Sequence, residues 1–340
     1  MVIELPISKS IANRLLILQA IHGDELMPVS DSMPDDVQIL HRALCLIASS
    51  PHCLIDVGNC GTAMRFLTAY CAQLEGQTTI LDGVERMHHR PIGQLVDALR
   101  EIGADIEYLG EEGFPPLRIK GCILDKHRIV TINNPLSTQF VSALLLIGAK
   151  VQTDSTSPYI YITQEVIKQY QLSPFSYHLS VEKDWSSAAF WYEYVALYGG
   201  EITLLGLSRD SLQGDKIVAD IFAHLGIHTT YTAEGAVISS SLLHPTPYTL
   251  HHDFVACPDL YPAVALTCER LGIELHATGV ESLPLKESDR LCAVREHRTD
   301  ADHRMAMALL IAGYEVDDTA CISKSYPNFI EHFRHINSLK

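Results

Sequence analysis

The sequence predicts an α/β protein of two domains in which one helix–strand unit recurs. The chain has 340 residues, of which 47% are hydrophobic, and a chain of this length usually divides its core between two domains. Apolar helix-like stretches alternate along it with a glycine and a short strand-like stretch. A glycine just past a helix can adopt the left-handed conformation that ends the helix, and a period of two fits a half-buried strand.

Six stretches carry this unit, and each is expected to form a helix followed by a strand. They lie at 95–109, 140–151, 190–207, 217–231, 261–277 and 306–316. Their spacing varies, so the repetition is structural and has no fixed sequence period. The best candidate for a domain crossing is SVEKDWSS at 180–187, where Asp184 is a suitable helix N-cap. Any α/β protein alternates helices and strands, so the pattern alone does not identify the fold.

The composition limits the possible functions. The formal net charge is −16, which argues against nucleic acid or an anionic membrane as a partner, because both are bound by a contiguous basic face. Nine cysteines without C-x-x-C spacing indicate neither a disulfide framework nor a zinc ribbon. No signal segment is recognisable, and no stretch approaches the roughly 20 apolar residues that span a bilayer. We therefore expect a soluble, cytoplasmic protein.

The 17 histidines do not indicate a metal site. The pairs at 88–89 and 251–252 are adjacent in the sequence, whereas two ligands on one helix face need a spacing of four residues. We expect no metal.

Short motifs that combine cations with hydroxyl, amide or glycine residues run along the whole chain. They are SKSIANR at 8–14, GNCGTAMR at 58–65, HRPIG at 89–93, STQF at 137–140, LKESDR at 285–290, DHRMAM at 302–307 and SKSYP at 323–327. Because the chain as a whole is acidic, these cations are not part of a general basic surface. Arginine forks and lysine point charges of this kind bind carboxylates and phosphates, so the motifs indicate one site for anionic ligands.

Each motif alone has a plain structural interpretation. GNCG can be a simple turn, and LKESDR can be the charged, solvated face of a helix. Arg65, one helical turn after the glycine loop, is expected to fix that loop. Asp35 and Asp36 fit a helix cap or a surface pair, and we assign them no role in the site.

Taken together and in this order, the motifs resemble the 5-enolpyruvylshikimate-3-phosphate synthase family. Further matches are Ser157-Pro158-Tyr159, Gln213-Gly214-Asp215, Pro258-Asp259 and Lys324. The resemblance covers nearly the whole chain, and the ordered set is specific although each motif is weak. It implies an α/β (α+β) fold of two domains, each built from three β-α-β-α-β-β units, with the active site at the domain interface.

The resemblance also implies the domain division and the reaction. The first domain would span residues 9–182, and the second would span 183–340 together with the N-terminal strand in 1–8. The enzyme would transfer the enolpyruvyl group of phosphoenolpyruvate to the 5-hydroxyl of shikimate 3-phosphate and release phosphate, in aromatic amino-acid biosynthesis. The implied partners are these two small molecules, the implied state is a monomer, and no cofactor is implied.

The resemblance assigns the site residues to three roles. The catalytic residues would be Asp259, Glu287 and Lys9. Phosphoenolpyruvate would be bound by Lys9, Gly61, Arg90, Gln139, Arg290, Arg304 and Lys324. Shikimate 3-phosphate would be bound by Ser10, Arg14, Ser137, Thr138, Gln139, Thr156, Tyr159, Asp259, Ser282 and Lys286. Thr156 and Ser282 depart from the residues most frequent in the family, which are serine and asparagine.

The charges suit this reaction. Two substrates that each carry a phosphate and a carboxylate bring about five to six negative charges together, and the predicted cations offset this repulsion. Asp259 would orient and deprotonate the hydroxyl, and Glu287 would exchange a proton with the methylene carbon. The family is the target of glyphosate, and Cys60 and Phe66 replace an alanine and a proline beside Gly61, which predicts an altered affinity for that inhibitor.

Two alternatives remain at this point. One is the related transferase that acts on UDP-N-acetylglucosamine, although Lys9-Ser10 and the STQF motif disagree with it. The other is a catalytically silent or shortened member that binds anionic ligands. The chain is shorter than the family, and the resemblance implies two or more additional strands between Arg290 and Asp302, where the sequence has room for little more than a helix.

Overall fold

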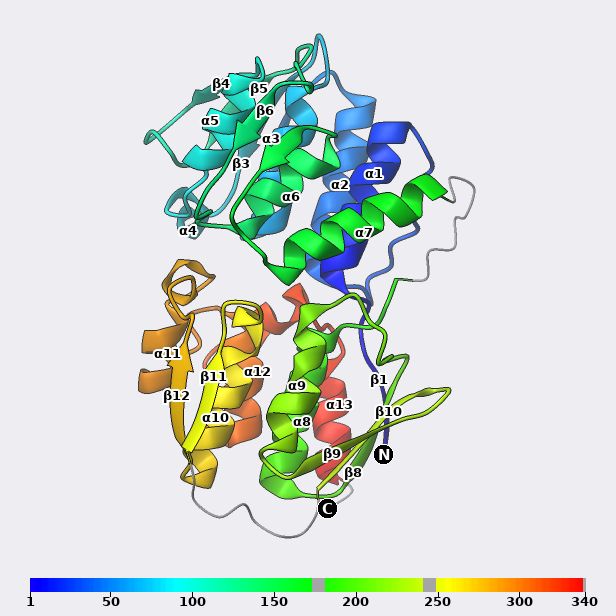
Figure 1. Ribbon diagram of the computed structural model, residues 1–340, viewed down its shortest axis with the longest axis vertical. Coiled ribbons are helices and arrows are strands. Elements are labelled where there is room, and N and C mark those ends of the chain that lie inside the picture. Colours follow the sequence, from blue (N-terminus) through cyan, green and yellow to red (C-terminus); the bar gives the residue numbers. More distant parts are fainter. Residues whose placement is uncertain (173–180, 241–248, 339–340) are drawn as a thin grey trace. The chain divides into compact units, whose positions relative to one another are not determined.

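The computed structural model describes residues 1–172, 181–240 and 249–338, which form two compact units (Figure 1). We call Lys9–Ser30 with Asp36–Ser180 the first unit, and Met1–Ser8 with Asp31–Asp35 and Val181–Lys340 the second unit. Helices and strands alternate through both. The predicted α/β fold class is confirmed.

The first unit contains seven helices and six strands in its described residues. In chain order they are α1 (Lys9–His22), α2 (Asp35–Ser49), β2 (His52–Asp56), α3 (Gly61–Ala72), β3 (Thr78–Asp82), α4 (Glu85–His88), α5 (Gly93–Glu101), β4 (Asp105–Tyr108), β5 (Leu117–Lys120), β6 (Ile129–Thr131), α6 (Thr138–Leu146), β7 (Lys150–Gln152) and α7 (Pro158–Leu172).

The second unit begins with the N-terminal strand and continues after α7. Its elements are β1 (Val2–Glu4), α8 (Trp185–Tyr198), β8 (Glu201–Leu205), η1 (Gly214–Ile217), α9 (Val218–Ala223), β9 (Ile227–Tyr231), β10 (Gly235–Ser240), β11 (Thr249–Asp253), η2 (Pro258–Leu260), α10 (Tyr261–Leu271), β12 (Glu274–Thr278), η3 (Leu283–Leu285), α11 (Arg290–Glu296), α12 (His303–Ala312), η4 (Ala320–Lys324) and α13 (Phe329–Ser338).

Each unit contains one complete β-α-β-α-β-β arrangement with a four-stranded sheet. In the first unit the strand order is β2-β3-β5-β4, with β2 parallel to β3 and β5 antiparallel to both of its neighbours. In the second unit the order β1-β8-β10-β9 repeats this pattern, with Val2 opposite Thr203 in the parallel pair. The same supersecondary unit therefore occurs in both halves of the chain.

The remaining β-α-β-α-β-β repeats have fewer strands than the two complete ones. This corrects the expectation of three complete repeats in each domain. The sheets β6-β7 and β11-β12 are parallel pairs that match only the first two strands of the complete order. In the described residues, no strand follows their outer helices α7 and α11 within the same sheet. In the described chain, no strand lies between α1 and α2 or between α12 and α13. The reason is length, because residues 297–302 alone separate α11 from α12.

One predicted strand is absent. The stretch 306–316 was expected to end in a strand, but α12 ends at Ala312 and Gly313 caps it with a left-handed φ of 85°. Residues 314–316 belong to no strand. A strand needs a partner to be stable, and none of the described strands runs beside this segment.

Three inner helices pack against one another in each unit. In the first unit they are α1, α3 and α6, and in the second they are α8, α10 and α12. Eleven of the twelve residues of α3 and nine of the ten of α12 are buried, as expected for helices that are apolar all round. Where a parallel strand pair is present, the inner helix lies between its two strands in the order of the chain.

Side chains fix where several inner helices begin. Asp184 accepts a hydrogen bond from the backbone N–H of Ser187, which confirms it as the N-cap of α8. Asp302 caps α12, Ser137 caps α6 and the Cys60 thiol caps α3. These residues satisfy backbone donors that a helix cannot satisfy itself, so each of them helps to fix the residue at which its helix begins.

Candidate active site

Within each unit, several of the predicted site residues lie at the N-terminal ends of inner helices. In the first unit, α1 begins at Lys9, α3 at Gly61 and α6 at Thr138. In the second unit, Asp259 lies in η2 just before α10, and Arg304 lies in the first turn of α12, whereas none of the predicted site residues lies at the start of α8. The free N–H groups and the dipole at a helix N-terminus favour anions. Helix starts with predicted ligands therefore occur in both units.

Lys9 is held by a carboxylate in the first unit. Its Nζ atom lies 3.0 Å from Oδ2 of Asp36, and Asp36 is buried, with only 2% of its surface exposed. The thiol of Cys60 donates to the backbone oxygen of Asp36 at 3.8 Å, so the start of α2 is tied to the start of α3. The interpretation of Asp36 as a cap or surface residue is therefore wrong. Asp36 positions the predicted catalytic lysine.

Gly61 lies against two guanidinium groups. A β-carbon built at Gly61 would lie 2.6 Å from Nη2 of Arg90 and 2.7 Å from Nη1 of Arg65. Arg65 donates to the backbone oxygens of Gly61 and Pro91, as expected for a residue that fixes the loop. A side chain at this position would require one of the two guanidinium groups to shift.

The third helix end of the first unit joins the glycine loop. Gln139 donates from Nε2 to the hydroxyl of Thr62 at 2.9 Å, which connects the first turns of α6 and α3. Ser137 accepts from the backbone N–H of Gln139, and Thr138 is the first residue of the helix. The STQF motif therefore forms a helix N-terminus beside Gly61.

Arg14 is fully buried and serves as a structural cation in this structure. It donates to the hydroxyls of Thr163 and Ser142 and to the backbone oxygens of Ser10 and Tyr159. Burial lowers the pKa of Arg14 to about 10, because a low-dielectric environment disfavours the charged form. Arg14 thereby joins α1 to α6 and α7, and brings Ser10 and Tyr159 to the same network.

Two replacements beside this network are also buried. Cys60 and Phe66 are each 1% exposed, and the guanidinium of Arg14 lies over the Phe66 ring at 5.4 Å. The altered glyphosate affinity that we expect from these two residues stays a prediction.

In the second unit, Asp259 is surrounded by cations. Arg290 donates to its Oδ1 at 2.7 Å and Arg304 to its Oδ2 at 2.8 Å. The Nζ of Lys286 lies 3.4 Å from Oδ1. Both carboxylate oxygens are thus engaged by residues predicted to bind substrate.

Glu287 is held in the same way. Lys324 donates to its Oε1 at 2.8 Å and Arg290 to its Oε2 at 3.1 Å. Arg290 also contacts Oδ2 of Asp302 at 2.8 Å, so one guanidinium joins three carboxylates. Burial disfavours the charge of Arg290, but these carboxylates outweigh it and raise the pKa of Arg290 overall. The four predicted cations of this unit are therefore paired with carboxylates before any ligand arrives.

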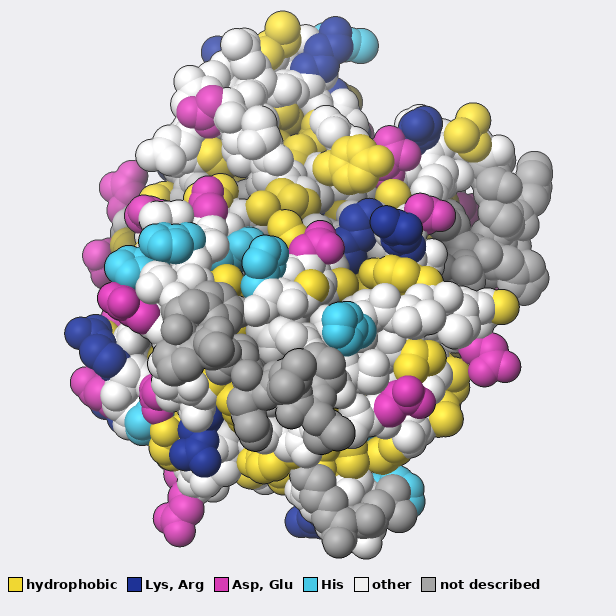
Figure 2. Space-filling view, turned by 60° about the horizontal axis from the view of Figure 1, so that its bottom comes forward, with side chains coloured by type: hydrophobic (Ala, Val, Ile, Leu, Met, Phe, Trp, Pro, Cys, Tyr) yellow, Lys and Arg dark blue, Asp and Glu magenta, His cyan; other side chains and the backbone are white. Residues whose placement is uncertain are grey.

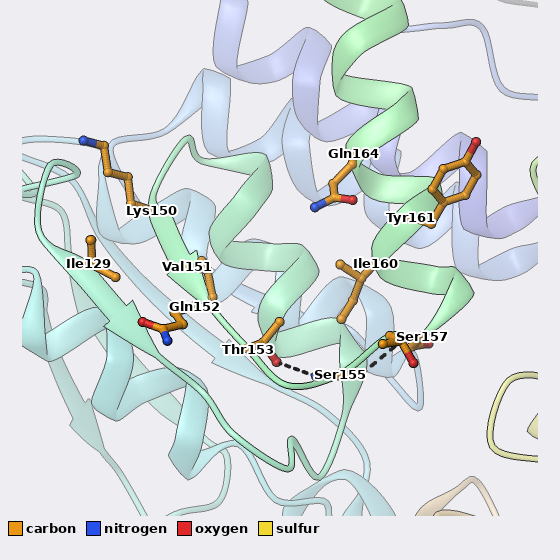
Figure 3. Close-up of a pocket in the computed structure, with 11 residues that line it drawn as sticks. Ile129, Lys150, Val151, Gln152, Thr153, Ser155, Ser157, Ile160, Tyr161 and Gln164 are labelled. Atoms are coloured by element: carbon orange, nitrogen blue, oxygen red, sulfur yellow. Dashed lines mark hydrogen bonds between the residues drawn. The ribbon is translucent and has the colours of Figure 1, made fainter.

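Two predicted residues lie apart from these clusters. Thr156 lines a pocket of about 580 Å³ between β7 and α7, together with Lys150, Gln152 and Gln164 (Figure 3). Ser282 precedes η3 and is half-buried, and in the described residues its hydroxyl forms no hydrogen bond to the cluster around Asp259. Thr156 and Ser282 are the two predicted ligand residues that depart from the family pattern. They are therefore also the two that lie outside these clusters.

Three residues of the clusters were missed by the sequence interpretation. Asp36, Asp302 and Thr163 support Lys9, Arg290 and Arg14 respectively. Asp302 stands in the DHRMAM motif, next to His303 and Arg304. The sequence therefore contained a signal that this carboxylate pairs with a basic side chain. Thr163 carries no such signal, because a threonine inside an amphipathic helix is unremarkable in sequence.

Charge on the surface is dispersed. On the face shown in Figure 2, the Lys and Arg side chains form small separate groups among Asp and Glu, and the net charge is −16. Within residues 1–172, 181–240 and 249–338, no group of three His, Cys, Asp or Glu side chains could hold a metal ion. None of the helices in these ranges is both long and apolar enough to cross a bilayer.

Comparison with known proteins identifies the family. The family model of EPSP synthase (3-phosphoshikimate 1-carboxyvinyltransferase) matches residues 28–297 and 295–333. A curated 3-phosphoshikimate 1-carboxyvinyltransferase of Bacteroides fragilis (strain ATCC 25285) is 37% identical, over 98% of this chain and 94% of that protein. One of Cellvibrio japonicus is 31% identical, over 99% of this chain and 96% of that protein.

The length difference and the fold agree with this result. The alignment with the Bacteroides fragilis protein extends over 393 positions, more than the 340 residues of the chain, so it opens gaps in this chain. Two structures of EPSP synthase from Acinetobacter baumannii superpose over 98% of this chain and 95% of theirs, with TM-scores of 0.70 and 0.67 at 18% and 19% identity. The motifs, the family model and the two curated relatives lead to one conclusion: the chain belongs to the EPSP synthase family, the 3-phosphoshikimate 1-carboxyvinyltransferases.

Proposed function

We propose that the protein transfers the enolpyruvyl group of phosphoenolpyruvate to the 5-hydroxyl of shikimate 3-phosphate and releases phosphate. The observation that supports this function best is that, within each unit, family motif residues lie at the starts of inner helices and form ion pairs and hydrogen bonds with one another. Helix N-termini with arginine and lysine side chains bind phosphate and carboxylate, and the two substrates present both groups.

The proposal assigns binding roles to residues of both units. Phosphoenolpyruvate is bound by Lys9, Gly61, Arg90 and Gln139 from the first unit and by Arg290, Arg304 and Lys324 from the second. Shikimate 3-phosphate is bound by Ser10, Arg14, Ser137, Thr138, Gln139, Thr156 and Tyr159, with Asp259, Ser282 and Lys286 from the second unit. The contacts of Gly61 with Arg65 and Arg90, and of Gln139 with Thr62, support the first set.

The carboxylates carry the proton transfers. In the addition step, the 5-hydroxyl oxygen bonds to C2 of phosphoenolpyruvate, Asp259 accepts the hydroxyl proton, and Glu287 delivers a proton to the C3 methylene carbon. In the elimination step, Glu287 removes a proton from C3, the C2–C3 double bond forms again and phosphate leaves. Lys9, fixed by Asp36, shares the proton role near the hydroxyl.

The ion pairs in the structure explain how substrate binding prepares these groups. Arg290 and Arg304 contact Asp259, and Lys324 contacts Glu287. When the substrate anions attract these cations, the carboxylates lose part of the positive field that favours their ionised form. Each then binds a proton more readily, as general acid–base catalysis requires.

The test is phosphate release with both substrates. We expect release that needs both phosphoenolpyruvate and shikimate 3-phosphate, and a loss of about 100-fold or more in kcat for Asp259→Ala and Glu287→Gln. Glu296→Gln is the matched control, since Glu296 is exposed at the end of α11 and should retain full activity. No release by the unmodified protein, or undiminished release by both site variants, would contradict the proposal.

The state and location of the protein complete the proposal. We propose a monomer in the cytoplasm whose domains are residues 9–182 and residues 1–8 with 183–340. The acidic composition supports a protein that remains dispersed. Light scattering on the purified protein measures the mass in solution, and a mass of two or more chains would contradict the monomer.

A further inference from the structure

Asp82 and His88 form a hydrogen-bonded pair that the proposed mechanism does not use. Asp82 is the last residue of β3, and His88 is the last residue of α4. The Nε2 atom of His88 lies 2.7 Å from Oδ1 of Asp82, and because a carboxylate oxygen accepts hydrogen bonds, Nε2 is the donor. The same Oδ1 accepts from the backbone N–H of Gly83 at 2.7 Å. One oxygen atom therefore joins both ends of the segment 82–88.

Two further carboxylates lie beside this pair. Asp56 is opposite Asp82 in the parallel strands β2 and β3, and its Oδ1 accepts from the backbone N–H of Gly58. Glu85 lies 3.8 Å from Nδ1 of His88, but its side chain is 84% exposed. The contact of His88 with Asp82 is shorter and better shielded from solvent, so it is the contact that fixes the end of α4.

The segment that the pair closes leads directly to Arg90. The backbone N–H of Arg90 donates to the carbonyl oxygen of Met87 at 3.0 Å, so Arg90 follows directly on the last turn of α4. Met87 is fully buried, and its Sδ atom accepts from Nη1 of Arg65 at 3.7 Å. The end of α4 therefore sets the point from which the side chain of Arg90 extends.

The same segment touches the glycine loop that follows β2. A β-carbon built at Gly83 would lie 2.5 Å from the backbone oxygen of Gly58, so the two loops are in direct contact. Across this contact, Nη1 of Arg90 donates to the backbone oxygen of Asn59 at 3.4 Å. Nη2 of Arg90 lies where a β-carbon on Gly61 would come within 2.6 Å of it. The guanidinium of Arg90 thus lies at the turn that begins α3.

We propose that Asp82 and His88 are positioning residues that hold Arg90 at the glycine loop for anion binding. This inference rests on the proposed function, because it takes Arg90 to be a ligand of the phosphoenolpyruvate anion. While the hydrogen bond is formed, the end of α4 is fixed and the guanidinium stays at the loop. When the bond is absent, only a fraction of the molecules present the guanidinium to the ligand. The apparent affinity falls by that fraction, and the chemical step is unchanged.

The first experiment measures the steady-state kinetics of His88→Ala. The KM for phosphoenolpyruvate should rise about three- to tenfold, the range for one lost hydrogen bond. The kcat and the KM for shikimate 3-phosphate should change less than about twofold, because only binding of one substrate is affected. His127→Ala is the control, since His127 is an exposed histidine of the same unit and should behave like the unmodified protein. An unchanged KM for phosphoenolpyruvate, or an equal rise in both KM values, would overturn the proposal.

Removal of Arg90 shows whether the pair acts through this arginine. In an Arg90→Gln protein, adding His88→Ala should raise the KM for phosphoenolpyruvate no further, because the guanidinium that the pair positions is gone. If the two effects multiply, the residues act independently and the proposal fails. Asp82→Ala removes the acceptor instead of the donor, and it supplies the same comparison if His88→Ala does not fold.

Sulfate binding separates this inference from the proposed function. Calorimetric titration with sulfate reports anion affinity without turnover. We expect His88→Ala to weaken sulfate binding about three- to tenfold, and the double variant with Arg90→Gln to bind sulfate no more weakly than Arg90→Gln alone. If the protein releases no phosphate yet shows this pattern, the function fails and the inference holds. If His88→Ala binds sulfate as tightly as the unmodified protein, the inference fails whatever the activity.

Discussion

Gly61 lies between two guanidinium groups, so the smallest added side chain has a defined consequence. In Gly61→Ala the new methyl group would lie within 2.8 Å of Arg65 and Arg90 atoms, and one of these side chains must move. Because Arg90 is a proposed phosphoenolpyruvate ligand, we expect the KM for that substrate to rise about tenfold or more. Steady-state kinetics measure this.

A matched glycine provides the control for this prediction. A β-carbon at Gly110 would meet nothing closer than 3.6 Å, so Gly110→Ala should leave the KM unchanged. Equal kinetics for the two variants would show that Arg90 is not needed where the structure places it.

Asp36 is the residue that holds Lys9, and its removal should affect catalysis. In Asp36→Asn the 3.0 Å ion pair is replaced by a neutral amide, so Lys9 loses its fixed position. We expect kcat to fall about 10- to 100-fold, measured as phosphate release. The exposed Asp97 in α5 supplies the control, since Asp97→Asn should be fully active. An Asp36→Asn protein with normal kcat would remove Lys9 from the proton transfers.

At the residue scale, the sequence predicted the charged residues of the clusters better than the residues that hold them in position. Asp259, Glu287 and Arg290 stand in recognisable motifs, and the structure brings them together. The role of Asp36 in holding Lys9 could not be predicted, because it depends on the packing of α2 beside the starts of α1 and α3. Long-range packing of this kind leaves no pattern in the local sequence.

Among the elements, α7 is joined to α1 in part through the hydroxyl of Thr163. Thr163 accepts from Nε of the buried Arg14 at 2.7 Å. In Thr163→Val this donor loses its partner, which should reduce the free energy of unfolding by about 1–3 kcal/mol and raise the KM for shikimate 3-phosphate. Urea denaturation measures the first quantity. Thr131→Val, at an exposed position of β6, should have no such effect, and equal stability of the two variants would contradict the prediction.

The short connection between α11 and α12 depends on Asp302. This buried side chain accepts from Arg290 and Ser288 and caps α12 through the backbone N–H of Arg304. In Asp302→Asn the charge that compensates Arg290 is weakened, so we expect a loss of about 3 kcal/mol in the free energy of unfolding. Chemical denaturation monitored by circular dichroism measures it.

The same turn contains the control for this prediction. Asp300 is exposed, and Asp300→Asn should be as stable as the unmodified protein. If Asp302→Asn were equally stable, the pairing with Arg290 would not be what holds this connection.

At the element scale, the predicted helix–strand stretches are present in five of six cases, because a glycine after an apolar run is a strong local signal. The exception at 314–316 shows the limit of such signals. A strand depends on a neighbour to pair with, and whether one is present is decided elsewhere in the chain.

For the molecule as a whole, the strongest pH effect on stability should come from Glu193. This residue of α8 is fully buried, and neither carboxylate oxygen has a hydrogen-bond partner among the described residues. Burial raises the pKa of Glu193 well above its usual value of 4.5. Above pH 4.5 the unfolded chain has released this proton and the folded chain keeps it, so the free energy of unfolding falls as the pH rises through this window.

Glu193→Gln removes this dependence. We expect the variant to be more stable than the unmodified protein at pH 8, by about 1–3 kcal/mol, and the difference to shrink toward pH 5. Urea denaturation at both pH values measures it. Glu201→Gln, exposed at the start of β8, should follow the unmodified protein, and an unchanged pH slope in Glu193→Gln would contradict the assignment.

At this scale the fold class and the family could be predicted from the sequence, whereas the architecture of the units could not. The motifs indicate where inner helices begin, and the structure has helices that begin there. The two-stranded sheets β6-β7 and β11-β12 could not be predicted, because the number of strands that pair in a sheet depends on contacts between distant parts of the chain.

The shortened units have a practical meaning for enzyme engineering. In β6-α6-β7 and β11-α10-β12, the inner helix keeps both flanking strands, although the hairpin of the complete unit is missing from the described residues. A strand, a helix and a strand therefore suffice to position the starts of α6 and α10 without the hairpin, and α1 and α12 are positioned without such a strand pair. A designer who wishes to shorten a large transferase could begin by removing this hairpin.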